Sequence, residues 1–255
     1  MLPGLNDAHE AVHEAITHLK EVASKYDAKM VTPELEVRFG TVTSSSFVPG
    51  MTRTALSKLE QYLDTNRDWY EVGEWTLTHA FTHASGIHND HRVLRSEVTF
   101  ISDAQRDVKT IEKKPISTST FKLDGETRPI SFRIAVAMEV HVPTKDIPLH
   151  IAPTHCVIKR RKVYTYTPTR YDHPTWAYCL TQRWHGSDLV NALVAVNTTE
   201  PVCDLELELM DMDYVMQTDT SELTMKLLWK TSDLLVAIAE CYHTRPVECT
   251  SLERV

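Results

Sequence analysis

Residues Pro33 to Gly40 read PELEVRFG and alternate between charged and apolar side chains. Successive side chains of a β-strand point to opposite faces, so Glu34, Glu36 and Arg38 would share one face, with apolar residues on the other. A strand that faces water and covers an apolar core shows the same pattern. The stretch therefore predicts a β-strand, and its charged face needs a second observation before it indicates a site.

The alternation returns near the other end of the chain. Residues Cys203 to Leu209 read CDLELEL, which places Asp204, Glu206 and Glu208 on one face of another strand. Like charges at close range raise one another's pKa values, so five carboxylates gathered from two strands need positive charge among them. A bound divalent cation would supply that charge, and the two strands together predict a metal site.

The composition is that of a soluble globular protein. Hydrophobic residues make up 42% of the 255, which is enough for a sizeable core, and we expect one domain spanning residues 1–255. No uncharged apolar run is long enough to cross a bilayer, and the N-terminus lacks a secretory signal, so we expect no membrane association. Five cysteines without C-x-x-C spacing indicate reduced thiols in the cytosol or nucleus.

Charge is distributed unevenly along the chain. The formal net charge of −8 argues against a protein that grips long nucleic acids by neutralising their phosphates. Basic residues nevertheless gather at Lys109–Lys114 and at Lys159–Lys162, while acidic residues gather in the two alternating strands. This distribution is typical of a site that combines metal ligands with anion clamps.

Alternation and turn signals predict eight strands and four helices. The strands are expected near residues 33–40, 75–83, 92–101, 108–116, 130–142, 156–167, 175–184 and 202–210, and the helices near 7–26, 52–63, 187–196 and 220–243. Eight antiparallel strands close readily into a barrel, and their charged faces can line its interior. The sequence thus predicts an α+β fold, a closed eight-stranded antiparallel β-barrel (a tunnel) with a polar lumen and packed helices that include the N- and C-terminal ones.

Three segments carry a resemblance to a known family. The segments from Glu34 to Gly40, from Arg133 to Glu139 and from Asp204 to Glu208 resemble the metal-dependent RNA 5′-triphosphatases of fungal, protozoan and viral mRNA capping. These enzymes belong to the triphosphate tunnel metalloenzymes, whose eight-stranded barrel is closed and has a hydrophilic lumen. The resemblance covers about residues 32–210, and Asp204 stands where the family usually has glutamate.

The acidic residues receive roles from this resemblance. It implies that Glu34, Glu36 and Glu208 hold Mg²⁺ or Mn²⁺ directly and that Glu206 orders water around the ion. Arg133 and Glu139 are six residues apart and would therefore both point into the lumen. Glu139 or Glu206 would orient water for in-line attack on a phosphate.

The resemblance also implies basic phosphate clamps. Lys113, or its neighbour Lys114, would supply one contact, and Arg95 would supply another. Cys179 replaces an aspartate of the family and cannot accept a salt bridge, which weakens any inference about a water-orienting network on that strand.

The second basic cluster allows two arrangements. Strand alternation places either Lys159 with Arg161 or Arg160 with Lys162 in the lumen. We choose Arg160 and Lys162, because the segment that begins at Lys162 aligns best with the family pattern.

The activity implied by the resemblance is hydrolysis of the γ-phosphate from the 5′-triphosphate end of nascent mRNA, the first step of cap formation. The enzyme would be a nuclear polynucleotide 5′-phosphatase. The capping activity implied by the resemblance would also need a guanylyltransferase, which is expected to be a separate partner protein. The same fold could act instead on nucleoside triphosphates or inorganic tripolyphosphate.

Three other interpretations start from different residues. His155-Cys156 begins a segment similar to the H-C-x₅-R loop of cysteine phosphatases, but the segment has no glycine and Lys162 stands in place of the arginine. Zinc could be bound by histidines without a cysteine partner, namely His79, His83, His88 and His91. A barrel that binds a ligand without chemistry should have an apolar interior, which the charged alternation disfavours.

Overall fold

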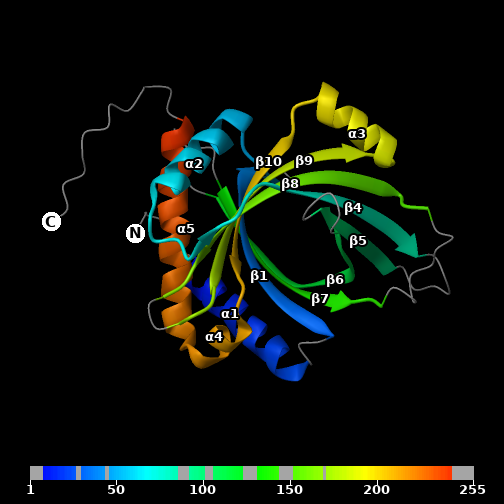
Figure 1. The fold of residues 1–255 in the computed structure, drawn as a ribbon. Helices are drawn as coiled ribbons and strands as arrows, with labels where there is room; N and C mark the ends of the chain where they lie inside the picture. The colour runs from blue at the N-terminus through cyan, green and yellow to red at the C-terminus, as the bar shows by residue number, and fades with distance from the viewer. Residues whose placement is uncertain are drawn as a thin grey trace.

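Eight long strands pair edge to edge into a closed ring in the computed structural model (Figure 1), which describes residues 8–26, 30–43, 46–85, 92–100, 106–122, 131–143, 152–168 and 171–242. In order around the ring they are β1 (Val31–Val42), β10 (Val202–Leu209), β9 (Trp176–Gly186), β8 (His155–Tyr166), β4 (Thr76–Ser85), β5 (Arg92–Phe100), β6 (Arg106–Phe121) and β7 (Ser131–His141). Every pair is antiparallel, and β7 returns to pair with β1. The predicted closed barrel and the α+β class are confirmed, and the assignment of residues 1–255 to one domain stays a prediction.

Two short strands extend the ring. β2 (Phe47–Pro49) pairs with the last residues of β1, and β3 (Glu71–Val72) pairs with the last part of β8. Gly40 permits the close approach of β2, because a Cβ atom at this position would collide with the backbone carbonyl of Val48. The sequence does not predict either strand, since two or three residues are too few to show an alternation.

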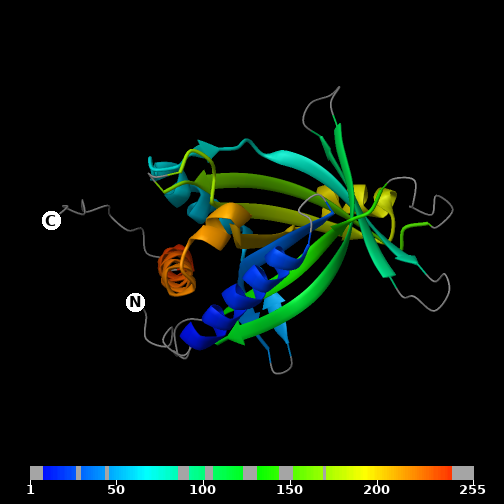
Figure 2. The same cartoon turned by 90° about the horizontal axis from the view of Figure 1, so that it is seen from below.

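Five helices of the described chain lie outside the barrel. They are α1 (His9–Lys25), α2 (Arg53–Thr65), α3 (Leu189–Thr198), α4 (Met212–Gln217) and α5 (Thr220–Tyr242). Figures 1 and 2 show α1, α2, α4 and α5 together on one side of the barrel, whereas α3 packs separately against β8 and β9. The four predicted helices are confirmed, and α4 is an addition. None of the described helices combines the length and the apolar character needed to span a membrane.

The last helix begins with an acidic cap. The Oδ1 atom of Asp219 accepts hydrogen bonds from the backbone N–H groups of Ser221 (2.8 Å) and Glu222 (3.2 Å). A carboxylate at this position also interacts favourably with the positive end of the helix dipole. The predicted start of the first helix, at residue 7, lies outside the described residues.

The apolar core lies between the outer surface of the barrel and the helices. Val37 pairs with Leu207 across β1 and β10, and the adjacent pair is Glu36 with Glu208. The valine and the leucine are fully buried in one cluster with side chains of α1, α2 and α5. Because side chains alternate along a strand, burying the apolar residues outside the ring turns the glutamates into the lumen.

We expect Leu207→Ala to lower the free energy of unfolding by about 3 kcal/mol, because it removes a fully buried side chain from this core. Val202→Ala is the matched control on the same strand. The Val202 side chain is 41% exposed, so its truncation should cost less than about 1 kcal/mol. Urea unfolding followed by circular dichroism measures both values, and equal losses would contradict a core outside the barrel.

Candidate functional site

The barrel encloses a cavity of about 610 Å³ that all eight of its long strands line. Among the described residues, its lining includes seven acidic and seven basic side chains. The acidic ones are Glu34, Glu36, Glu97, Asp107, Glu139, Glu206 and Glu208, and the basic ones are Arg38, Arg95, Lys109, Lys113, Lys159, Arg161 and Arg183. This interior is polar and balanced in charge, unlike the apolar interior expected of a barrel that binds an apolar ligand.

Three carboxylates gather on the wall formed by β1 and β10, and we call Glu34, Glu36 and Glu208 the carboxylate trio. One oxygen atom from each lies within 4.8 Å of the others, and no second group of this kind forms in the described parts of the chain. The strands produce the trio, because Glu34 and Glu36 share a strand face and Glu208 is the register partner of Glu36. Mg²⁺ and Mn²⁺ prefer oxygen ligands, so the trio fits a hard divalent cation.

Basic side chains contact the trio in this structure. The Nζ atom of Lys113 lies 2.5 Å from Glu34 and 3.5 Å from Glu36, and an Nη atom of Arg161 lies 2.5 Å from the third member. Burial raises the pKa of Glu208 to about 7, against the opposing effect of Arg161. Burial also raises the pKa of Glu36. Carboxylates that are so difficult to ionise require positive charge close by, which a bound cation would supply.

Glu206 lies between two guanidinium groups rather than in the trio. An Nη atom of Arg38 lies 2.9 Å from its carboxylate, and an Nη atom of Arg161 lies 3.8 Å from it. Burial raises the pKa of Glu206, but Arg38 and Arg161, with Lys159 and Arg183, together lower it by more, and the resulting pKa is below the ordinary value. Glu206 is therefore ionised at neutral pH, and its role in ordering water around a metal stays a prediction.

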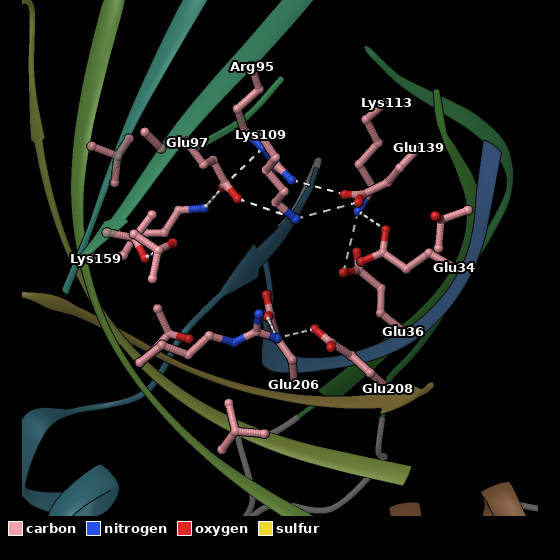
Figure 3. Close-up of a pocket in the computed structure, with 18 of the residues that line it drawn as sticks. Glu34, Glu36, Arg95, Glu97, Lys109, Lys113, Glu139, Lys159, Glu206 and Glu208 are labelled. Carbon is pink, nitrogen blue, oxygen red and sulfur yellow. Dashed lines mark hydrogen bonds and ion pairs between the residues drawn. The ribbon is translucent and has the colours of Figure 1, made fainter. Parts of the chain in front are cut away.

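The wall that faces the trio carries cations from β5, β6 and β8. Arg95 lies 3.0 Å from Glu139 of β7, and Lys109 lies 3.8 Å from the same carboxylate. Lys159 contacts Glu97 at 2.7 Å. Figure 3 shows Glu97 and Lys159 across the lumen from the trio, and Glu139 beside Lys113. The cavity thus places groups that bind anions opposite groups that bind a cation.

Most of the predicted site residues share the lumen. Those in its lining are Glu34, Glu36, Arg95, Lys113, Glu139, Glu206 and Glu208, and their individual roles stay predictions. Lys114 does not line the cavity and pairs instead with Glu112 at 3.5 Å. Arg133 has the strand parity of Glu139, but it lies beside β2, with its guanidinium carbon 5.0 Å from the centroid of the Phe47 ring.

The prediction that Arg160 and Lys162 face the lumen is wrong. The Nζ atom of Lys162 lies 3.1 Å from Glu60 and 3.0 Å from Asp64, both on α2 outside the barrel. The guanidinium carbon of Arg160 lies 5.5 Å from the ring centroid of Trp75. Both side chains therefore belong to the outer surface of β8.

Lys159 and Arg161 line the lumen in their place. Cys156, Ile158 and Tyr164 occupy the other face of β8 and are buried outside the barrel. Because side chains alternate along the strand, burial of these three residues fixes the parity of the basic residues between them.

Five further charged lumen residues carry no predicted role. They are Arg38, Glu97, Lys109, Asp107 and Arg183. Strand parity is the signal that points to the first three, because each lies two or four residues from a predicted site residue on its own strand. Arg183, which lies 2.5 Å from Asp204, has no comparable neighbour in the sequence.

Two of the other interpretations find no support in the described residues. Cys156 is buried outside the barrel, and burial raises its pKa, so it is not an activated nucleophile. Among the proposed zinc ligands, His79 packs against Phe100 with 4.8 Å between ring centroids, and His88 and His91 lie outside the described residues. No described histidine or cysteine takes part in a group that could hold a metal.

The fold and the site define a closed antiparallel barrel whose charged lumen combines a carboxylate trio with facing cations. Similar solved structures are RNA triphosphatases. The S. pombe Pct1 RNA triphosphatase matches with a TM-score of 0.62 and 15% identity, over 96% of this chain and 95% of that one. The same protein in complex with the Spt5 CTD gives a TM-score of 0.65 at 14% identity, over 92% and 94%.

The mimivirus capping enzyme triphosphatase gives a TM-score of 0.50 at 14% identity, over 86% of this chain and 95% of that one. No family model and no curated protein matches the sequence. At these identities the likeness establishes the fold.

We expect the binding of Mn²⁺ to weaken as the pH falls through about 7, because a proton on Glu208 competes with the metal. The raised pKa means that the carboxylate is ionised above this pH and must release a proton on binding below it. Calorimetric titration in two buffers of different ionisation enthalpy should detect more proton release at about pH 6 than at about pH 8. Glu208→Gln should reduce this difference, and equal release at both pH values in the wild type would contradict the raised pKa.

Proposed function

We propose that the protein is a metal-dependent RNA 5′-triphosphatase, which hydrolyses the γ-phosphate from the 5′-triphosphate end of nascent mRNA in the first step of cap formation. The observation that carries the proposal is the position of the carboxylate trio across one lumen from Arg95, Lys109 and Lys159. The fold that the chain shares with RNA triphosphatases supports it.

A triphosphate end would use both halves of the lumen. The trio would hold Mg²⁺ or Mn²⁺, whose charge would stabilise the negative charge on phosphate oxygens. Phosphoryl transfer is catalysed chiefly by positioning and charge stabilisation. Arg95, Lys109 and Lys159 would therefore bind the remaining phosphate oxygens, and Glu139 or Glu206 would orient the attacking water.

Lys113 and Arg161 would change partners in the loaded site. Each contacts a trio carboxylate at 2.5 Å in this structure. When the trio holds a divalent cation, these carboxylates no longer neutralise the two basic side chains. Lys113 and Arg161 could then turn to phosphate oxygens, so the trio and the clamps would act together.

The proposed activity implies a compartment, a partner enzyme and a set of comparison substrates. An enzyme that begins cap formation on nascent mRNA would act in the nucleus, and a separate guanylyltransferase would complete the cap. Nucleoside triphosphates and inorganic tripolyphosphate would enter the same lumen, so they are the comparison substrates of choice.

We expect Arg161→Ala to lower kcat/KM for triphosphate RNA by about a hundredfold or more, because it removes a guanidinium that faces the trio. Arg160→Ala is the matched control, since it removes the adjacent arginine from the outer surface of the same strand and should leave kcat/KM within about twofold. Glu208→Gln should abolish metal-dependent hydrolysis and leave the protein folded. Phosphate release from γ-labelled RNA measures all three variants. Equal losses of kcat/KM for the two arginine variants would contradict the placement of Arg161 in the lumen and of Arg160 on the outer surface.

We expect kcat/KM to depend weakly on RNA length and on salt, because most of the binding free energy would come from the triphosphate and its metal. The test compares a short triphosphate RNA, a long one, ATP and inorganic tripolyphosphate at two salt concentrations, with Mg²⁺ and with Mn²⁺. ATP should be hydrolysed more slowly than RNA, with Mn²⁺ as the more permissive ion. Faster hydrolysis of ATP or tripolyphosphate than of RNA under every condition would contradict the proposed substrate.

A further inference from the structure

Glu97 contacts three cations of the wall that faces the trio. Its Oε1 atom lies 2.7 Å from the Nζ atom of Lys159 and 3.2 Å from the Nε atom of Arg95. Its Oε2 atom lies 3.5 Å from the Nζ atom of Lys109. The three bases come from β8, β5 and β6, and Glu97 is only 7% exposed. One buried carboxylate therefore links basic side chains from three strands.

Strand β4, which lies between β8 and β5, leaves room for Lys159 to reach Glu97. Thr78 of β4 is the register partner of Lys159, and Ala80 of β4 is the register partner of Glu97. Both β4 residues line the lumen, and both side chains are small. The long Lys159 side chain can therefore cross β4 and reach the carboxylate.

The charges of the cluster depend on this carboxylate. Burial lowers the pKa of Lys159, and Glu97 opposes that shift. Burial raises the pKa of Glu97, but Lys159, Arg95 and Lys109 together lower it by more, to about 2, so the carboxylate stays ionised. Glu97 contacts all three cations, whereas Glu139 contacts only Arg95 and Lys109. Three positive charges thus face two negative ones, and the cluster keeps a net positive charge toward the lumen.

We propose that Glu97 is a positioning residue that holds Arg95, Lys109 and Lys159 together as a cradle for the phosphate chain of the substrate. Glu97 lies outside the trio, and it would act through the three cations that it contacts. This inference rests on the proposed function, because a polyphosphate is the ligand that the cradle would take.

If Glu97 acts only through its charge, or instead by positioning the three cations, its removal should have opposite effects on polyphosphate binding. Removing a negative charge makes the wall more positive, which by itself would strengthen the attraction for a polyphosphate. If Glu97 acts by positioning, its loss lets the three cations move apart and lets Lys159 release its proton more easily, so polyphosphate binding weakens.

The experiment measures the binding of inorganic tripolyphosphate without metal by isothermal titration calorimetry. Glu97→Gln should weaken this binding about tenfold or more. As the pH is raised, the variant should lose the binding at a lower pH than the wild type does, because Lys159 releases its proton more easily. The KM for triphosphate RNA should rise in parallel. Glu112→Gln is the matched control, because it also removes one acid, but Glu112 pairs with Lys114 and does not line the cavity. The control should bind tripolyphosphate as the wild type does.

Glu97→Asp separates position from charge, since it keeps the carboxylate and shortens the side chain by one methylene. Weaker tripolyphosphate binding in this variant supports the proposal, and this variant alone decides if Glu97→Gln does not fold. Binding equal to or tighter than that of the wild type in a folded Glu97 variant overturns the proposal, even when RNA hydrolysis is normal. If the wild type binds tripolyphosphate but does not hydrolyse triphosphate RNA, the proposed function fails, and the variants still decide the role of Glu97.

Discussion

Attraction between opposite charges enclosed in one lumen is the interaction on which the rest of the structure depends. Isolated ionised groups are unfavourable to bury, and buried charges persist when each has partners of opposite sign. Arg38 contacts both Glu36 and Glu206, and Lys113 contacts both Glu34 and Glu36. Because charged side chains fill the lumen, it cannot serve as the hydrophobic core of the protein.

The core must therefore lie outside the barrel, which explains the helices. The apolar outer faces of β1, β7, β9 and β10 and part of β8 are buried in one cluster with side chains of α1, α2 and α5. Closure of the ring between β1 and β10 removes the last free edges of the sheet. The same pairing brings Glu36 beside Glu208. A single strand contact thus completes both the fold and the carboxylate trio.

Sequence alternation predicts strand faces well where leucine and valine mark one side. Burial of these residues fixes the register in β1 and β10, and the charged side must then face the lumen. In β8, apolar residues flank the four basic ones on both faces, with Ile158 buried outside and Val157 in the lumen, so alternation does not fix their side. Lys162 turns outward toward Glu60 of α2, a contact that only the tertiary structure creates. Strand parity places Glu97 on the face of Arg95, but its partners Lys109 and Lys159 belong to other strands, so the sequence does not reveal that one acid joins all three cations. The ring of strands and the trio were therefore predictable, whereas the cation wall required the packing of the whole barrel.

Arg161 shows how the charge balance of the lumen can change. It donates to the Sγ atom of Cys179 at 2.9 Å and lies 2.5 Å from Glu208. Burial raises the pKa of Cys179, so the thiol stays neutral and adds no negative charge. The nearest negative charge to Arg161 is then Glu208, with Glu206 farther away at 3.8 Å. A cation held by Glu208 would offset that nearest charge, whereas an aspartate at position 179 would continue to neutralise Arg161. Cysteine in place of the aspartate of the resembling family would thus leave more of the guanidinium charge for the anionic substrate of the proposed reaction.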